Sequence, residues 1–257
     1  METIIKEKIK KLSDNLGKQI IAVVYNPCMK EGMKESDCFF LKFLLKKARY
    51  TAPLFILSGR GGDYVPGVLF PYLILDKVKN YKTYVPLTCG SALCYTLIKS
   101  SKLYLGKNAK ITQIDPTFEY RGESLRAINH LRSMDPLLRR NARDTFNNAK
   151  ENVAKLSEPP SIFKFEVMNP KEFQHQDDIA TYFMNKDEHE TPLTKKELGE
   201  LEVNFQELSE EIDNLSEEFI QVCQDFTIKK EVRVIFVSSI PLKMEKEKDG
   251  RFICPLK

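Results

Sequence analysis

The chain has 257 residues, and 40 Lys plus Arg against 36 Asp plus Glu give it a formal net charge of +4. An excess this small argues against a protein that binds nucleic acid. The hydrophobic share of 42%, with 16 Phe and 10 Tyr, is enough for one sizeable core and excludes disorder as the main state. No apolar run is long enough to span a membrane and the first residues lack the apolar stretch of a signal peptide, so we expect a soluble, cytoplasmic protein.

The cysteines show neither a CxxC pair nor a histidine at the spacing of a zinc site. The six of them are spread along the chain, at positions 28, 38, 89, 94, 223 and 254. This pattern predicts reduced thiols and no structural metal. We also expect no cofactor.

Residues 1–120 alternate short apolar runs with helical patterns, which is typical of an α/β core. The run Pro53–Leu57 is continuously apolar, as expected for a strand buried on both faces. In chain order we expect a helix over 2–16, a strand over 20–25, a helix over 36–48, a strand over 53–57, a helix over 65–78, a strand over 83–87, a helix over 92–99, and strands over 102–105 and 110–114.

Residues 121–230 are predicted to form a mainly helical part of the same domain. A helical pattern runs from Glu123 to Leu156 and is broken or kinked at Pro136. Apolar residues between 201 and 222 repeat at heptad spacing, which fits a core face or a seam with a partner helix; we favour the core face. Two apolar runs in residues 231–257 predict a C-terminal β-hairpin.

Two turns that contain glycine, at 58–63 and 88–92, each follow a predicted strand, and ligands bind at such strand ends in open α/β sheets. No Gly-Lys-Ser/Thr follows the first turn, so it is not a Walker A loop. Paired glycines at Gly61 and Gly62 let a backbone N–H approach an oxygen, as an oxyanion hole requires.

Ser91 lies at the start of a predicted helix, where the partial positive charge of the helix end stabilises negative charge. It is either an N-cap or a nucleophile. Cys89 is a rival nucleophile, but no neighbour in the sequence would lower the pKa of its thiol, so we expect it to fill apolar space.

The order of strands, turns and helices from about residue 20 to 225 resembles the serine dehydrogenase proteinase family. These are serine peptidases of the ClpP/crotonase fold, related to signal peptide peptidase A, and the resemblance implies repeated β-β-α units. It also implies Ser91 as the nucleophile, with oxyanion donors at Gly61, helped by Gly62, and at Ala92. The chain departs from the family's motifs in two places, with Arg60 where proline is usual and Leu93 where glycine is usual.

A serine nucleophile needs a base, and the chain has three histidines. His189 precedes a Thr-Pro-Leu-Thr stretch similar to the family's segment after its histidine, so the resemblance makes it the candidate base. His130 and His175 lie on helical patterns and are expected at the surface or in packing contacts. Asp115, before Pro116, would orient the base, shape the pocket, or only stabilise its own turn. A Ser–Lys dyad is the alternative that sequence alone does not resolve.

The resulting expectation is a serine peptidase that acts on peptides or proteins as a homo-oligomer: a trimer, a hexamer or another ring. The first alternative is a catalytically inactive scaffold or sensor, because Leu93 replaces a glycine. The second is a crotonase-type acyl-coenzyme A enzyme. Charge is uneven, since residues 121–155 carry eight basic and four acidic residues while 187–218 carry two basic and twelve acidic ones. These segments are solvated faces or meet across subunits.

Overall fold

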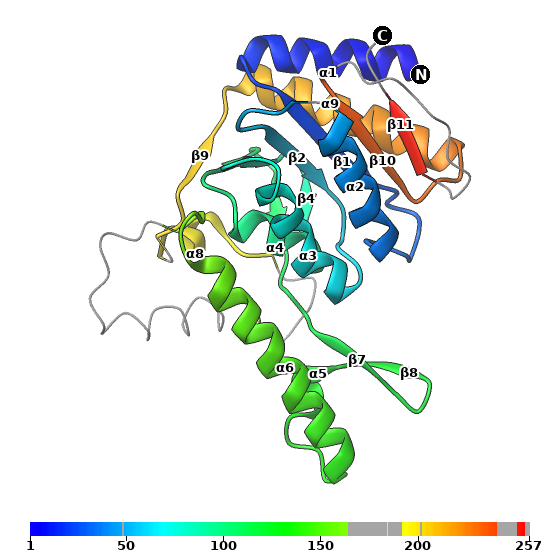
Figure 1. Cartoon of the computed structure of the whole chain (residues 1–257), viewed down its shortest axis with the longest axis vertical. Coiled ribbons are helices and arrows are strands. Elements are labelled where there is room, and N and C mark those ends of the chain that lie inside the picture. Colours follow the sequence, from blue (N-terminus) through cyan, green and yellow to red (C-terminus); the bar gives the residue numbers. More distant parts are fainter. Residues whose placement is uncertain (48, 164–183, 185–191, 201, 241–250, 255–257) are drawn as a thin grey trace.

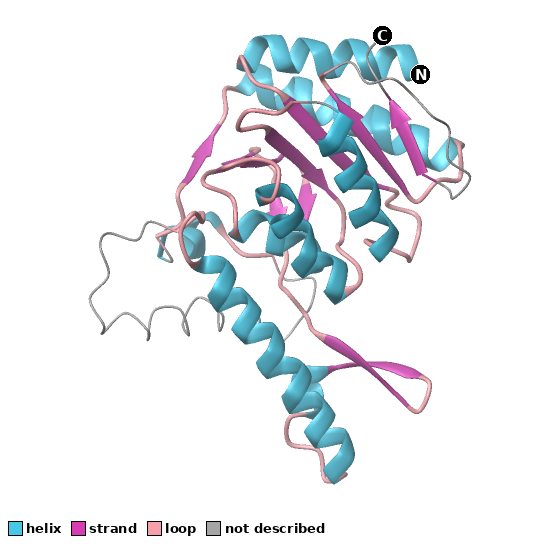
Figure 2. Cartoon of the chain, viewed as in Figure 1, coloured by secondary structure: helices cyan, strands magenta, loops and turns pink. Residues whose placement is uncertain are grey.

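The computed structural model describes residues 1–47, 49–163, 184, 192–200, 202–240 and 251–254. Across these residues a seven-stranded sheet forms the centre of the molecule, and helices cover both of its faces (Figures 1 and 2). The strand order is β11-β10-β1-β2-β3-β5-β9. The strands of this sheet are β1 (Ile20–Tyr25), β2 (Leu54–Ser58), β3 (Lys82–Val85), β5 (Leu103–Leu105), β9 (Phe205–Glu207), β10 (Val234–Ser238) and β11 (Arg251–Cys254).

Strands β1, β2, β3, β5 and β9 are parallel, so their carboxyl ends meet at one edge of the sheet. The register aligns Ile20 with Leu54 and Leu54 with Lys82. All residues of β1 and β2 are buried, because helices lie on both faces, and this explains why their sequences are continuously apolar. The predicted α/β class with a parallel sheet is confirmed; the repeated β-β-α unit stays a prediction.

The helices form two layers (Figure 1). On one face, α1 packs beside α9, and on the other lie α2, α3 and α4. The apolar residues Ile5, Ile9 and Leu12 of α1 recur every three to four positions and are fully buried. The described helices are α1 (Glu2–Leu16), α2 (Glu35–Lys47), α3 (Tyr64–Leu75), η1 (Ser91–Leu93), α4 (Cys94–Ile98), α5 (Ala127–His130), α6 (Pro136–Ser157), α8 (Lys195–Glu200) and α9 (Glu210–Lys229).

Two small sheets complete the described structure. β4 (Thr88–Cys89) pairs in parallel with β6 (Lys110–Ile111), and β7 (Thr117–Tyr120) forms an antiparallel hairpin with β8 (Glu123–Arg126). This hairpin, α5 and the first part of α6 extend away from the main sheet (Figure 1). The later part of α6 returns to the core, where Ala149, a residue of that part, is buried.

The predicted C-terminal β-hairpin is wrong. β11 pairs with β10 in parallel, with Val234 opposite Arg251, whereas the two strands of a hairpin are antiparallel. β10 instead runs antiparallel to β1, so β10 and β11 both run opposite to the five parallel strands.

The helical pattern predicted over 123–156 is broken before Pro136, as one of the two expectations has it, into α5 and α6, but its first residues are not helical. Residues 123–126 form β8, and α6 begins at Pro136. The side chain of Asp135 accepts hydrogen bonds from the N–H groups of Leu137 (2.9 Å) and Leu138 (3.2 Å), so it caps the helix. Proline lacks an N–H and suits the first helical position, which is why Pro136 starts this helix rather than kinking it.

The heptad pattern over 201–222 also divides between two elements. Phe205 lies in β9, and the pattern is helical only from Glu210, where α9 begins. Leu215 and Phe219 of α9 are buried against the sheet, as the core-face interpretation predicts. Among the described residues, no helix combines the length and the apolar character that a membrane span requires.

Candidate active site

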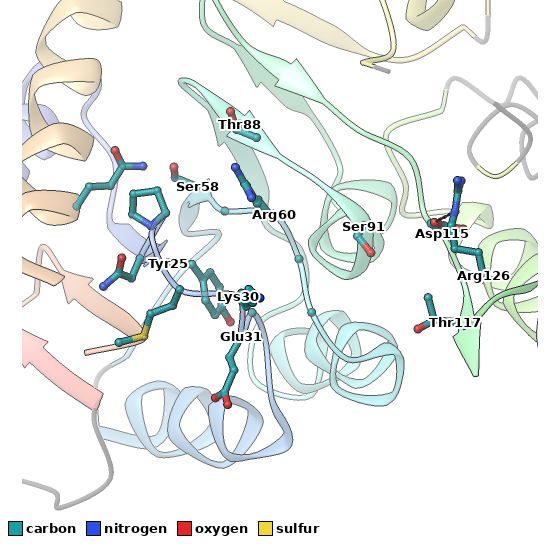
Figure 3. Close-up of a pocket in the computed structure, with 18 residues that line it drawn as sticks. Tyr25, Lys30, Glu31, Ser58, Arg60, Thr88, Ser91, Asp115, Thr117 and Arg126 are labelled. Atoms are coloured by element: carbon teal, nitrogen blue, oxygen red, sulfur yellow. Dashed lines mark hydrogen bonds and ion pairs between the residues drawn. The ribbon is translucent and has the colours of Figure 1, made fainter. Parts of the chain in front are cut away.

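A cleft of about 580 Å³ opens at the carboxyl ends of β1 and β2 (Figure 3). Its walls are the loop after β1, the glycine turn after β2, the turn after β4, and the start of the β7–β8 hairpin. Parallel strand ends lie at a common edge, so turns far apart in the sequence meet here. Gly61, Gly62, Ser91 and Asp115 all line this cleft, as the sequence predicts for a single site.

Ser91 has a left-handed backbone conformation, with φ of +48°. This region is rarely adopted by residues other than glycine, and such strained positions gather at active sites. The Ser91 N–H donates to the carbonyl of Gln113 at 3.0 Å, which holds the turn in place. The N-cap of η1 is Gly90, so Ser91 does not occupy the cap position, and its side chain faces the cleft (Figure 3).

The turn that contains Gly61 packs directly on the Ser91 turn. Gly61 has φ of +98°, and a Cβ placed on it would lie 2.6 Å from Ser91 Cβ and 2.7 Å from the nitrogen of Ala92. Only glycine permits this approach. Among the described residues, the Gly61 N–H donates to no acceptor, whereas the Gly61 carbonyl accepts from Met33 N–H at 2.7 Å. The N–H groups of Gly61 and Ala92, which the resemblance implies as oxyanion donors, therefore lie close together.

A second, smaller hollow of about 20 Å³ lies beside Ser91 and Ala92 and is also lined by Gly62 and Tyr95. This volume accommodates one water-sized atom. The Tyr95 hydroxyl is buried without a hydrogen-bond partner among the described residues. Buried polar groups are rarely left unpaired unless a water or ligand completes them.

Asp115 lines the cleft and is already paired. Its carboxylate forms an ion pair with Arg126 of β8, and its side chain is only 6% exposed. Figure 3 shows this pair on the side of the cleft toward which the Ser91 hydroxyl points. Asp115 thus forms part of the wall of the site, through a partner that the sequence analysis did not identify.

The structure does not place the candidate base. His189 and His175 lie outside the described residues. His130 is on α5, where its ring packs edge-on against Phe118 with centroids 6.5 Å apart, and it does not line the cleft. Lys30 is the lysine that lines the cleft within the described ranges, on the wall formed by the loop after β1.

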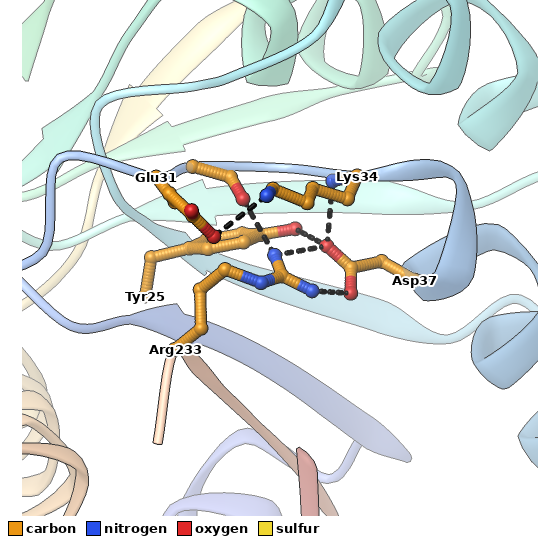
Figure 4. Close-up of polar contacts among 6 residues, drawn as sticks. Tyr25, Glu31, Lys34, Asp37 and Arg233 are labelled. Carbon is orange, nitrogen blue, oxygen red and sulfur yellow. Dashed lines mark hydrogen bonds and ion pairs between the residues drawn. The ribbon is translucent and has the colours of Figure 1, made fainter. Parts of the chain in front are cut away.

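A buried ion pair holds the loop after β1 (Figure 4). Asp37 of α2 is fully buried and accepts hydrogen bonds from both Nη atoms of Arg233, from the Tyr25 hydroxyl at 3.0 Å and from Lys34 N–H at 2.9 Å. Arg233 also donates to the carbonyl of Gly32 at 2.5 Å. Gly32 contacts the Gly61 turn, so this network links α2 and the residue before β10 to that turn.

Burial and the charge of Asp37 determine the protonation of this network. Burial, followed by the nearby Asp37 carboxylate, raises the pKa of Tyr25, so its phenol stays a proton donor. Burial acts to lower the pKa of Arg233, but the hydrogen bonds and charge of Asp37 outweigh it and raise that pKa. The guanidinium is therefore charged at any physiological pH.

Cys89, the rival nucleophile, is fully buried and does not line the cleft. Burial raises the pKa of its thiol well above the usual value, and the neighbouring Cys94 raises it further. A protonated, buried thiol is a poor nucleophile. This agrees with the expectation that Cys89 fills apolar space.

Two parts of the site were missed in the sequence: the loop after β1 and Arg126. Asn26-Pro27 stops a buried strand adjacent to β2 in the sheet, so the common carboxyl edge could have indicated this loop. Arg126 carries no such sequence pattern, because its contact with Asp115 depends on the β7–β8 hairpin. Within the described ranges, no group of three His, Cys, Asp or Glu side chains is placed to hold a metal ion.

Comparisons with known proteins identify no family for this chain. No family model matches it, and no curated protein matches it. Among solved structures, the 1510-N membrane-bound stomatin-specific protease, a mutant in complex with a substrate peptide, is similar over 66% of this chain and 67% of that chain, at 14% identity and a TM-score of 0.39. A likeness at this level supports no conclusion about fold or activity, so the resemblance to serine dehydrogenase proteinases stays a prediction.

Proposed function

We propose that the protein is a serine peptidase in which Ser91 attacks a peptide carbonyl. The observation that carries this proposal is the left-handed conformation of Ser91 in a cleft where the Gly61 turn packs on Ala92. A strained serine at a turn between strand and helix presents its hydroxyl to substrate. The proposal does not depend on the low structural likeness described above.

The reaction follows the usual course of acyl transfer. Ser91 Oγ bonds to the carbonyl carbon while a base takes the hydroxyl proton, and the carbonyl oxygen becomes an oxyanion. The N–H groups of Gly61 and Ala92 would hold this oxyanion, with Gly62 shaping the turn; one such donor contributes about 10²–10³ in rate. The base returns its proton to the leaving amine, and water then hydrolyses the ester on Ser91.

His189 is the proposed base on the strength of the sequence resemblance. Asp115 is held by Arg126, which supports a role in shaping the cleft rather than in orienting an imidazole. Lys30 is the alternative base because it lines the same cleft. The variants His189→Gln and Lys30→Met distinguish them: the variant that lacks the base should lose the pH dependence of acylation together with most of its rate.

A fluorophosphonate probe, followed by mass spectrometry, tests the nucleophile. We expect the native protein to be labelled at Ser91, Ser91→Ala to be unlabelled, and Ser124→Ala, which changes an exposed serine on β8, to be labelled normally. Equal labelling of Ser91→Ala, or no labelling of the native protein beside a reactive control hydrolase, would contradict the proposal.

One observation favours an inactive scaffold or sensor instead. Leu93, where the resembled family has glycine, is fully buried, and Asp115 is engaged by Arg126. Absence of labelling with an intact fold, measured by circular dichroism, would select this function. A homo-oligomer also stays a prediction, and light scattering that gives the mass of a single chain would contradict it.

A further inference from the structure

Within the described ranges, the two acidic side chains that line the cleft are both paired with neighbouring cations. Glu31 forms an ion pair with Lys34 at 2.6 Å, and Asp115 forms one with Arg126. Neither carboxylate is therefore left to balance a further positive charge in the cleft.

Two cations of the cleft have no such partner among the described residues. Arg60 and Lys30 line it, are exposed, and form no ion pair with any residue that the structure describes. Arg60 directly precedes Gly61, the proposed oxyanion donor, in the chain. Figure 3 shows the Arg60 guanidinium at the side of the cleft where Ser58 and Thr88 lie.

Ser58 supplies an independent sign of a ligand. It ends β2, lines the cleft and is 1% exposed, yet its hydroxyl has no hydrogen-bond partner among the described residues. Buried hydroxyl groups are rarely left unpaired unless a water or ligand completes them. Thr88, which starts β4, adds a second hydroxyl-bearing side chain to the same corner of the cleft (Figure 3).

We propose that Arg60, Ser58 and Thr88 form a subsite that binds a carboxylate side chain of the peptide substrate. The guanidinium and the two hydroxyl groups are donors, and an ionised Asp or Glu side chain is an acceptor that can take several hydrogen bonds at once. A neutral amide has a single acceptor oxygen and no charge, so it would bind less tightly. This inference rests on the proposed peptidase function and names its substrate class: peptides with an acidic residue near the scissile bond.

The kinetic test uses internally quenched peptides of one sequence in which a single Glu or Gln is moved through the positions on either side of the cleavage site. At one position we expect kcat/KM to be about tenfold higher for Glu than for Gln, the ratio that a charged hydrogen bond provides. Arg60→Gln should reduce this ratio to about one. Arg60→Glu should favour Lys at that position.

Control variants separate the effect of this subsite from that of the overall positive charge of the protein. Lys10→Gln removes one positive charge from the exposed face of α1 and should leave the Glu to Gln ratio unchanged. Raising the salt concentration should reduce the ratio, because screening weakens exposed charge pairs. Ser58→Ala should reduce the ratio without abolishing it, since one of the donors is lost.

A binding measurement keeps the two proposals distinguishable. With the Ser91→Ala variant, the anisotropy of a fluorescein-labelled Glu peptide should show tighter binding than that of its Gln counterpart, and Arg60→Gln should remove the difference. A protein that reacts with the fluorophosphonate probe but cleaves Glu and Gln peptides at equal rates at every position would overturn the acidic subsite alone. A protein that does not react with the probe but still binds the Glu peptide more tightly would retain the subsite and overturn the peptidase. Equal binding of both peptides by Ser91→Ala would overturn the subsite.

Discussion

Replacing Arg233 by Met should destabilise the fold more than the loss of any exposed ion pair. The Asp37 side chain is completely buried and that of Arg233 is 11% exposed, so the pair is shielded from water. Removing the arginine leaves a buried carboxylate with two donors, the Tyr25 hydroxyl and Lys34 N–H, both bonded to one of its oxygens. The other oxygen, Oδ1, loses its contact with Arg233.

The expected cost follows from this burial. Removing one partner of a buried ion pair costs about 3–5 kcal/mol. A domain has only about 5–15 kcal/mol of total stability. At about 2–4 °C per kcal/mol for a chain of this size, the midpoint of thermal unfolding should fall by about 6–20 °C. The double variant Asp37→Leu with Arg233→Met should recover much of the loss, because it leaves no unpaired charge.

Circular dichroism during heating and guanidinium titration measures these changes. The matched control is Lys8→Met, which breaks the exposed pair of Lys8 with Glu218, 2.6 Å apart, and should cost no more than about 1 kcal/mol. Arg233→Lys keeps the charge but not the two-pronged contact, so we expect an intermediate value. If Arg233→Met unfolds at the same midpoint as Lys8→Met, the buried Asp37–Arg233 pair does not stabilise the loop after β1 as argued.

The other predictions concern the turn beside Ser91 and its surroundings. Gly61→Ala should slow fluorophosphonate labelling more than tenfold, because its Cβ would lie 2.7 Å from the Ala92 nitrogen. The control Gly122→Ala, with φ of +84° and open space around it, should cost only about 1–2 kcal/mol of stability through backbone strain. Equal labelling rates for the two variants would contradict this prediction. Iodoacetamide at pH 8 should modify the exposed Cys28 well before Cys89, whose pKa is raised by burial and by its neighbour Cys94, and peptide mapping that finds Cys89 modified first would refute that assignment. Leu93→Ala should lower the free energy of unfolding by about 2–5 kcal/mol, since the side chain is fully buried, and a change below 1 kcal/mol in chemical denaturation would show that the site tolerates a smaller residue.

Much of the α/β core follows from local patterns. The runs Ile20–Tyr25 and Leu54–Ser58 are continuously apolar, and they are parallel strands buried on both faces. Glycine next to a strand end predicts a turn, and this places Gly61 and Ser91 at the same edge of the sheet. These features depend on residues that are close in the sequence or on a general property of parallel sheets.

Strand pairing at the ends of the sheet is different. β10 and β11 look like a hairpin because both are short apolar runs, yet they pair in parallel. β9 lies within a region with heptad spacing, but Phe205–Glu207 pairs with β5 instead of continuing into a helix. A short apolar segment does not specify its own partner strand, because pairing depends on how its side chains pack against the neighbouring strands.

The partners of charged residues are likewise not specified by the local sequence. Asp37 and Arg233 are 196 positions apart, and Asp115 meets Arg126 only because the β7–β8 hairpin pairs Arg126 with Thr117. Alone, the sequence determined a parallel α/β core, the two glycine turns and Ser91 at a strand end, because hydrophobic periodicity and turn chemistry act over a few residues. Only the tertiary structure decided which charges are paired and which, such as Arg60, have no ion-pair partner among the described residues, because ion pairing depends on distances of a few ångströms between distant parts of the chain.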